Sequence, residues 1–153
     1  MNTDTHILQT VILNYKTPEM TLESIAAALV AMDGIEGEIT VVDNHSQDGS
    51  YEQIRDHIAA KGWDENGRVR VLQSGHNGGF GAGNNFGIRA GLADGRVPDL
   101  IYVLNSDAFP APDAIQQLIT TLDNTPSAGF AGSYIHGPSG DPHITAFRFP
   151  SIA

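Results

Sequence analysis

The chain has 153 residues, and its 41% hydrophobic and 17% charged residues are typical of a folded globular protein and exclude a disordered one. A formal net charge of −10 excludes a nucleic-acid backbone as partner, because such binding requires a basic surface. The absence of cysteine excludes disulfides and thiolate catalysis.

The N-terminal part of the chain alternates between apolar segments and helical periodicity. Residues 7–13 are predicted to form a first strand. The run Thr17-Pro18-Glu19 predicts a helix start, with a hydroxyl N-cap, a proline at the first position and an acid in the first turn. The apolar face of this helix is predicted to consist of Leu22, Ile25, Ala26 and Leu29. A second strand is expected at 39–42.

The same alternation continues to about residue 131. We expect a short helix that begins near Ser50, a strand at 69–72, a glycine-rich stretch at 75–87 and a strand at 100–104. The helical residues expected in this part are Ile54 and Ile58, then Ile88 and Leu92, and finally Ile115, Leu118, Ile119 and Leu122 after a start at Pro112-Asp113. A fifth strand is predicted at 128–131, and residues 133–153 are predicted to form a hairpin or loop.

Strands that alternate with helices predict an α/β fold with a mostly parallel sheet and right-handed crossovers. We expect one domain over residues 1–153. The first ten residues lack the basic and apolar regions of a signal peptide, and no segment approaches the length of a membrane-spanning helix. The expected location is therefore cytoplasmic, with any membrane contact peripheral and at the inner face.

Three of the predicted strands end in polar clusters. These clusters are Asn14-Tyr15-Lys16, Asp43-Asn44 and Asn105-Ser106-Asp107. Any one of them could be a turn or a helix cap. Because the carboxyl ends of parallel strands share one edge of a sheet, three such clusters favour a binding crevice at that edge.

Asp107 is the candidate metal ligand, because it follows directly after a buried-looking strand. Mg²⁺ or Mn²⁺ takes one or two protein carboxylates and completes its coordination with phosphate and water oxygens. Such an ion would neutralise the charge that develops on a departing diphosphate. The alternative is that Asp107 caps a turn before Pro110.

The glycine-dense segment 75–85 leads into a predicted helix, where glycine permits close backbone approach and the helix N-terminus attracts phosphate. The segment does not match G-x-G-x-x-G, since Asn84 stands where a glycine is required, and it lacks the G-K-[ST] ending of a P-loop. A surface loop is the alternative.

Residues 44–55 resemble a calcium loop but end in Arg55 instead of a bidentate glutamate, and the six histidines have no metal-ligand spacing.

Four motifs together resemble family 2 glycosyltransferases of the GT-A fold, which is a Rossmann-like, three-layer α/β/α fold. They are residues 11–15 (VILNY), 41–50 (VVDNHSQDGS), 77–87 (NGGFGAGNNFG) and 104–107 (LNSD). The resemblance runs in order from about Val11 to Pro150 and is greatest to the rhamnosyltransferase-like bacterial branch.

This resemblance implies transfer of a sugar from a dTDP-, UDP- or GDP-sugar to an acceptor hydroxyl, with inversion and with Mg²⁺ or Mn²⁺. The acceptor would be a glycan or glycolipid in bacterial cell-surface synthesis. By position, Asn14 and Tyr15 would line the nucleotide pocket, and Asp43 would contact the base or ribose with Asn44 beside it. The donor would also be contacted by Asn77, Gly79, Phe80, Gly83, Asn84, Asn105 and Ser106, while Asp107 matches the metal-binding carboxylate of the D-x-D motif.

The sequence departs from the family pattern in two places. Asn105 stands where many members have the first Asp of D-x-D, and Asn84 stands where many have an Arg that meets the diphosphate. The acceptor-deprotonating carboxylate of the family lies beyond the point that matches residues 149–151, so we expect the donor-binding part of a longer enzyme. A non-catalytic nucleotide-sugar-binding module is one alternative. A nucleotidyltransferase is another, although residues 14–18 lack the basic glycine-rich loop that it would need.

Overall fold

The computed structural model describes residues 6–137 and 139–141. Internal contacts divide the chain into two compact units, Met1–Ile115 and Gln116–Ala153, and each is considered by itself. The first unit holds the sheet and every predicted site residue. That residues 1–153 form a single domain stays a prediction.

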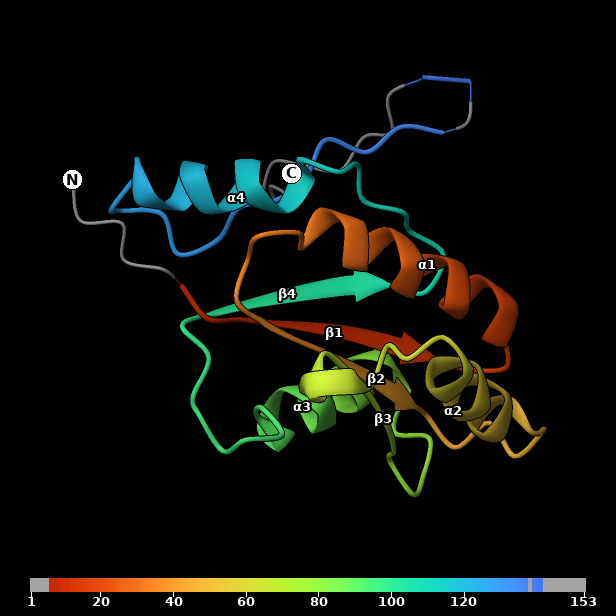
Figure 1. Cartoon of the computed structure of the whole chain (residues 1–153). Helices are drawn as coiled ribbons and strands as arrows, with labels where there is room; N and C mark the ends of the chain where they lie inside the picture. Colours follow the sequence, from red (N-terminus) through yellow and green to blue (C-terminus); the bar gives the residue numbers. More distant parts are fainter. Residues whose placement is uncertain (1–5, 138, 142–153) are drawn as a thin grey trace, which may run out of the picture. The chain divides into compact units, whose positions relative to one another are not determined.

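Strands and helices alternate along the first unit (Figure 1). In chain order they are β1 (Leu8–Asn14), α1 (Pro18–Ala31), β2 (Gly37–Asp43), α2 (Ser50–Ala60), the 3-10 helix η1 (Glu65–Gly67), β3 (Val69–Gln73), α3 (Gly79–Ala90) and β4 (Leu100–Asn105). A last helix, α4 (Ala114–Asp123), follows. Each of the first four predicted strands is therefore confirmed, with ends that differ by at most two residues.

The four strands form a parallel sheet in the order β3-β2-β1-β4. Every residue of β1 is buried, and β2 is buried from Glu38 onward, whereas β3 and β4 are partly exposed at the two edges of the described sheet. The apolar residues on both faces of the central strands, 11–13 in β1 and 41–42 in β2, follow from this position, because a parallel strand covered on both faces has no solvent side.

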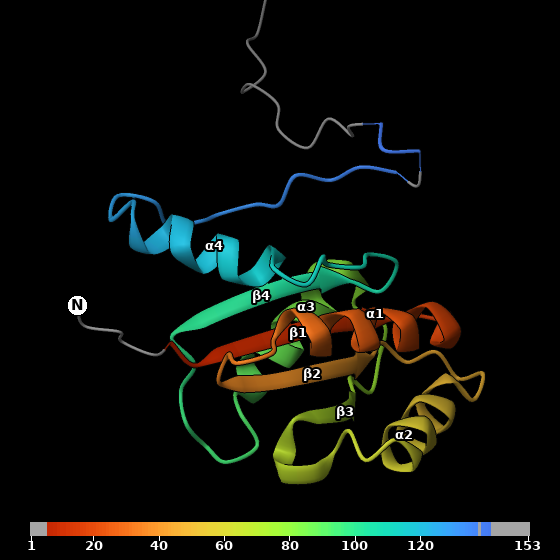
Figure 2. The same ribbon diagram turned by 45° about the horizontal axis from the view of Figure 1, so that its top comes forward.

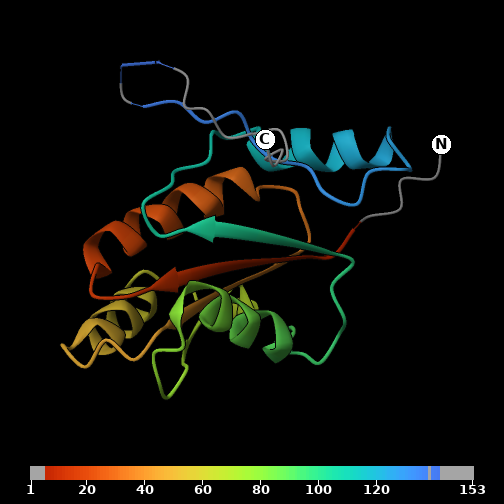
Figure 3. The same ribbon diagram turned by 180° about the vertical axis from the view of Figure 1, so that it is seen from behind.

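Helices cover both faces of the sheet (Figures 2 and 3). α1 and α2 pack together on one face, and α3 covers the other. Successive β1 side chains point to opposite faces: Thr10 bonds to Met32 just after α1, while Val11 lies against Gly87 of α3. The predicted α/β/α layering is thus confirmed.

The C-terminal end of α3 is tied to the sheet by a buried amide. The Nε2 atom of Gln9 donates to the backbone oxygens of Gly87, at 2.9 Å, and Gly91, at 3.0 Å. Because Gln9 is fully buried on β1, this pair of bonds fixes the position of α3 along the strand. The opposite end of α3 lies at the carboxyl edge of the sheet.

Two expectations for α1 were wrong in detail. Thr17 occupies the N-cap position but makes no side-chain cap bond, and its backbone nitrogen donates to the Oδ1 atom of Asn14. The buried face is Pro18, Thr21, Ser24, Ile25, Ala28 and Ala31, whereas Leu22, Ala26 and Leu29 are half-buried. Small and hydroxyl residues form this face because α1 packs closely on strand ends that offer polar partners.

The glycine-rich segment is mostly helix rather than a loop before one. α3 begins at Gly79 and ends at Ala90, before Leu92, which was expected inside it. Gly83 and Gly87 face the sheet, where a Cβ atom would come within 3 Å of Leu13 and of Val11 and Val42 respectively. Close helix–sheet packing therefore accounts for glycines that resembled loop residues in the sequence.

The end of the described chain differs from the prediction in two ways, the start of α4 and the absence of a fifth strand. α4 begins at Ala114, since Pro112 and Asp113 form a turn before it, and residues 128–131 form no strand. Gly137 and Gly140 lie in a turn closed by backbone bonds from Gly137 N to Asp141 O and from Gly140 N to Gly137 O. The rest of the predicted hairpin, 142–153, lies outside the described residues. No helix in the described part of the chain is long and apolar enough to cross a membrane.

Candidate functional site

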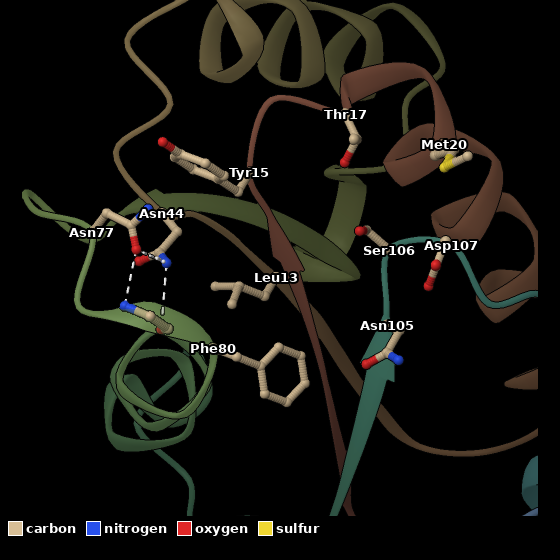
Figure 4. Close-up of a pocket in the computed structure, with 11 residues that line it drawn as sticks. Leu13, Tyr15, Thr17, Met20, Asn44, Asn77, Phe80, Asn105, Ser106 and Asp107 are labelled. Atoms are coloured by element: carbon tan, nitrogen blue, oxygen red, sulfur yellow. Dashed lines mark hydrogen bonds between the residues drawn. The ribbon is translucent and has the colours of Figure 1, made fainter.

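A cleft of about 480 Å³ opens at the carboxyl edge of the sheet (Figure 4). The end of β1, the first turns of α1 and α3, and the segments that follow β2, β3 and β4 all contribute to its walls. The lining residues are Leu13, Tyr15, Thr17, Met20, Asn44, Asn77, Gly79, Phe80, Asn105, Ser106 and Asp107. The structure therefore brings the three polar strand ends to one edge, as the sequence predicted.

Most of the predicted donor-binding residues line this cleft. They are Tyr15, Asn44, Asn77, Gly79, Phe80, Asn105, Ser106 and the predicted metal ligand Asp107. Four predicted residues lie outside it: Asn14, Asp43, Gly83 and Asn84. The contacts of all twelve residues with a ligand stay predictions, but the four outlying residues have partners or positions that the sequence did not indicate.

Asn14 and Asp43 lie beneath the cleft, on the α1 side of the sheet. Asn14 is fully buried and Asp43 is 1% exposed. Asn14 Nδ2 donates to Asp43 Oδ1 at 2.8 Å, and Asn14 Oδ1 accepts from the Thr21 hydroxyl at 2.8 Å. Ser46 donates to both oxygens of Asp43. These side chains are therefore engaged within the protein.

Gly83 and Asn84 lie on the buried side of α3. Gly83 packs on Leu13 and on the side-chain oxygen of Asn44. Asn84 Nδ2 donates to the backbone oxygen of Phe80 in the preceding turn, at 2.9 Å, while its buried Oδ1 has no hydrogen-bond partner among the described residues. Only the first turn of α3, at Gly79 and Phe80, thus reaches the cleft.

Asn44 and Asn77, which both line this cleft, form an amide pair. Asn44 Nδ2 donates to Asn77 Oδ1 at 2.9 Å, and Asn77 Oδ1 also accepts from the backbone nitrogen of Gly79 at 2.9 Å. The hydroxyl of Ser74 donates to Asn44 Oδ1.

A second cleft, of about 440 Å³, is lined by Asp43, His45, Gln47, Gly49, Tyr51, Glu52, Gln73 and Gly75.

Asp107 lies on a turn that follows β4 and is exposed toward the cleft. The backbone nitrogen of Ala108 donates to the oxygen of Asn105 at 3.1 Å, which closes the turn. The buried hydroxyl of Ser24 on α1 lies 3.2 Å from Asn105 O and 2.9 Å from Ala108 O, so α1 holds both ends of the turn.

The side chains of the cleft fit a divalent ion that shares its coordination with a ligand. Asp107 is the only charged side chain among the lining residues, and Asn105 and Ser106 add amide and hydroxyl oxygens. No group of three or more His, Cys, Asp or Glu residues in the described part of the chain could hold a metal alone. One carboxylate with neutral oxygens suits Mg²⁺ or Mn²⁺ when phosphate oxygens and water complete the shell.

Several residues of the site were not predicted from the sequence. Leu13, Thr17 and Met20 line the cleft. The sequence signal that could have found them is their closeness to the polar cluster Asn14-Tyr15-Lys16. Ser24 and Ser46 do not line the cleft, but their hydroxyls bond to segments next to its lining residues. A single serine in a helix or a turn is ordinary, so their role became visible only in three dimensions.

The family model described as "Glycosyl transferase family 2" matches residues 10–150, so the chain belongs to glycosyl transferase family 2. No curated protein matches the sequence.

Two solved structures have a similar fold. The mannosyltransferase PcManGT from Pyrobaculum calidifontis, in complex with GDP-Man and Mn²⁺, matches with a TM-score of 0.65 and 18% identity over 78% of this chain and 33% of that chain. TarS 1–349 from S. aureus, in complex with UDP-GlcNAc, matches with a TM-score of 0.58 and 18% identity over 76% of this chain and 31% of that chain. The chain therefore spans about a third of each, and its fold is that of GT-A glycosyltransferases.

Proposed function

We propose that this chain binds the nucleotide-sugar donor of a metal-dependent, inverting glycosyltransferase, and that the main cleft is the donor site. The carrying observation is that Asp107, Tyr15 and the first turn of α3 converge on one cleft at the carboxyl edge of the sheet. Ligands of open α/β sheets bind at this edge. The family supports a nucleotide-sugar donor, and both similar structures contain one.

The charge distribution of the cleft supports a role for the metal. A diphosphate brings negative charge, yet the lining residues include Asp107 and no lysine or arginine. Asp107, with Asn105 and Ser106 beside it, would hold Mg²⁺ or Mn²⁺. A bound divalent ion supplies charge neutralisation at a leaving diphosphate. Tyr15 and Phe80 offer exposed aromatic faces on which the base or sugar ring could pack.

The type of sugar transfer, the donor and the acceptor are inferred from the sequence motifs. We propose a hexosyl transfer, of the rhamnosyltransferase-like type, from a dTDP-, UDP- or GDP-sugar to a hydroxyl of a bacterial surface glycan or glycolipid. Such an enzyme would act in the cytoplasm or at the inner face of the membrane. The general base would come from elsewhere, because Asp107 is the only carboxylate among the described residues that line the cleft, and it is assigned to the metal.

The same observation favours a second candidate, a nucleotide-sugar-binding module without transferase activity of its own. It predicts the same donor affinity but no sugar transfer and no donor hydrolysis. A coupled assay for released nucleoside diphosphate, with a sugar-nucleotide that the chain binds, distinguishes the two. Release above the uncatalysed rate rejects the inactive module.

Isothermal titration with dTDP, UDP and GDP, each with and without Mn²⁺, tests donor binding. We expect one of the three to bind only when Mn²⁺ is present. Asp107→Ala should abolish the Mn²⁺-dependent binding. Asp113→Ala, which replaces an exposed carboxylate outside the cleft, should bind as the unaltered chain does. No metal-dependent binding of any nucleotide would reject the proposal.

A further inference from the structure

Asn14 and Asp43 form a buried polar pair between the two central strands. They are register partners at the last positions of β1 and β2, and the Asn14 amide donates to the Asp43 carboxylate at 2.8 Å. Within the described part of the chain no lysine or arginine bonds to this carboxylate, which accepts from the Asn14 amide and from the backbone nitrogen and hydroxyl of Ser46. A buried carboxyl group that is held by neutral partners alone depends on each of those hydrogen bonds.

Ser46 connects this pair to the loops on both sides. Its hydroxyl donates to Asp43 Oδ1 at 2.6 Å and accepts from the backbone nitrogen of Lys16 at 3.0 Å. The Asn14 amide lies 3.3 Å from the same hydroxyl. One buried side chain thus joins the loop after β1 to the loop after β2.

Both loops contain strained backbone. Lys16, His45 and Gln47 have φ values of +59°, +62° and +56°, in the left-handed region that residues with a Cβ atom rarely adopt. Such conformations are strained and persist only where surrounding contacts fix them. The bond from Lys16 N to Ser46, and the bond from Ser46 N to Asp43, supply contacts of this kind at the strained positions.

The cleft-lining residues Tyr15 and Asn44 lie within these strained loops. Tyr15 stands between Asn14 and Lys16, and Asn44 stands between Asp43 and His45. We propose that Asn14, Asp43 and Ser46 form a positioning cluster that holds Tyr15 and Asn44 in their ligand-binding geometry from beneath. The ligand part of this inference rests on the proposed donor site, whereas the positioning part does not.

This assignment gives Asp43 a different task from the base or ribose contact predicted from the sequence. With 1% exposure it borders the second cleft, yet its oxygens are occupied by Asn14 and Ser46. A direct contact and a positioning role make different predictions for Ser46, which lines neither cleft.

Ser46→Ala tests the cluster, and Ser50→Ala is the matched control. Ser50 is an equally buried serine that follows the β2–α2 connection, but its hydroxyl bonds to Asp48 and not to the cluster. Amide hydrogen exchange should speed up at least about tenfold at residues 15–17 and 44–47 in Ser46→Ala, because that variant loses the hydroxyl bonds to Asp43 and Lys16, and it should stay unchanged there in Ser50→Ala. The Kd for the nucleotide that binds the unaltered chain should rise by about the same factor in Ser46→Ala alone.

Unchanged exchange and affinity in Ser46→Ala would overturn the inference. So would an Asp43→Asn variant that loses affinity while its loop exchange stays normal, because that result assigns Asp43 a direct contact. If Ser46→Ala does not fold, Ser46→Cys preserves the volume and weakens the same bonds, and the comparison is made on it. If the unaltered chain binds no nucleotide, the proposed donor site fails, and the exchange measurement still decides the positioning role.

Discussion

The hydroxyl of Ser24, on α1, lies 3.2 Å from the backbone oxygen of Asn105, the last residue of β4. The same hydroxyl lies 2.9 Å from the oxygen of Ala108, so it spans the turn that carries Ser106 and Asp107. Helix α1 therefore does more than cover the sheet. It determines where the candidate metal ligand is presented.

Ser24→Ala should weaken both the fold and the metal-dependent affinity. The variant removes the hydroxyl that bonds to the part-buried oxygen of Ala108, whereas the Asn105 oxygen keeps its bond from the Ala108 backbone nitrogen, so the loss is about 0.5–1.5 kcal/mol of unfolding free energy. Urea denaturation measures this loss, and titration of nucleotide with Mn²⁺ should show a several-fold weaker complex. Thr120→Ala removes an exposed helical hydroxyl and should change neither quantity. Undiminished affinity in Ser24→Ala would show that the turn holds its geometry without α1.

The glycines of α3 should respond to alanine according to the face that they occupy. A Cβ atom at Gly87 would lie 2.8 Å from Val11 and Val42, two buried β-branched side chains that cannot turn away, so Gly87→Ala should destabilise by about 1–3 kcal/mol. A Cβ atom at Gly81 would point into open space, with no described neighbour within 4 Å, and Gly81→Ala should stabilise by about 0.5–1 kcal/mol. Thermal unfolding of the two variants should move in opposite directions. Equal shifts would contradict the packing described for α3.

Arg68 should contribute strongly to stability through backbone contacts. Its guanidinium donates to the carbonyl oxygens of Met32, Ile35 and Gly37 at 2.6, 3.0 and 2.8 Å, which closes the connection from α1 to β2. Burial lowers the pKa of this guanidinium, consistent with its withdrawal from water.

Arg68→Lys keeps the charge but cannot reach three acceptors in a fixed fork, so the unfolding free energy should fall by about 2 kcal/mol. Arg55→Lys, at an exposed pair with Asp56, should leave it nearly unchanged, because solvent screens exposed ion pairs. Equal urea midpoints for the two variants would contradict the closing role of Arg68.

The carboxyl group of Asp48 should titrate with a lowered pKa, and the lowering should depend on Ser50. The Ser50 hydroxyl, 2.5 Å from Asp48 Oδ1, lowers the pKa of that carboxyl, and the Ser50 backbone nitrogen adds to the effect. Because the pKa is lower in the folded protein, the contribution to stability is present above the unfolded-state pKa and is lost as pH falls through the folded-state value. In Ser50→Ala the pKa of Asp48 should rise, as measured by carbon NMR of the carboxyl group. An unchanged titration would show that the hydroxyl has no such effect.

The regular parts of this fold were predictable because their signals are local. Apolar runs such as 39–42 indicated the central strands, and Pro18 marked the first residue of α1. The start of α3 was not predictable, since Gly83 and Gly87 read as loop glycines until Leu13, Val11 and Val42 are placed against them. The spacing of these glycines in the sequence does not reveal that they lie on the side of the helix that meets the sheet.

The site was predictable at the level of strand ends but not of side-chain direction. Tyr15, Asn44 and Asp107 reach the cleft as residue type and position indicated. Asn14 and Asp43 precede Tyr15 and Asn44 by one residue, and because successive side chains on a strand alternate, they point to the opposite face. A polar cluster in the sequence therefore divides into lining residues and supporting residues, and only the structure separates the two.

Paramagnetic broadening by Mn²⁺ tests the central claim most directly. With the bound nucleoside diphosphate present, Mn²⁺ should broaden the NMR signals of residues 105–107 and of Gly79 and Phe80, and Asp107→Ala should abolish the effect. Without nucleotide, the single carboxylate of the cleft should hold the ion too weakly for comparable broadening. Broadening centred on the second cleft, at His45 and Gln47, or none near Asp107 in the presence of nucleotide, would contradict the assignment of this cleft as a metal-assisted donor site.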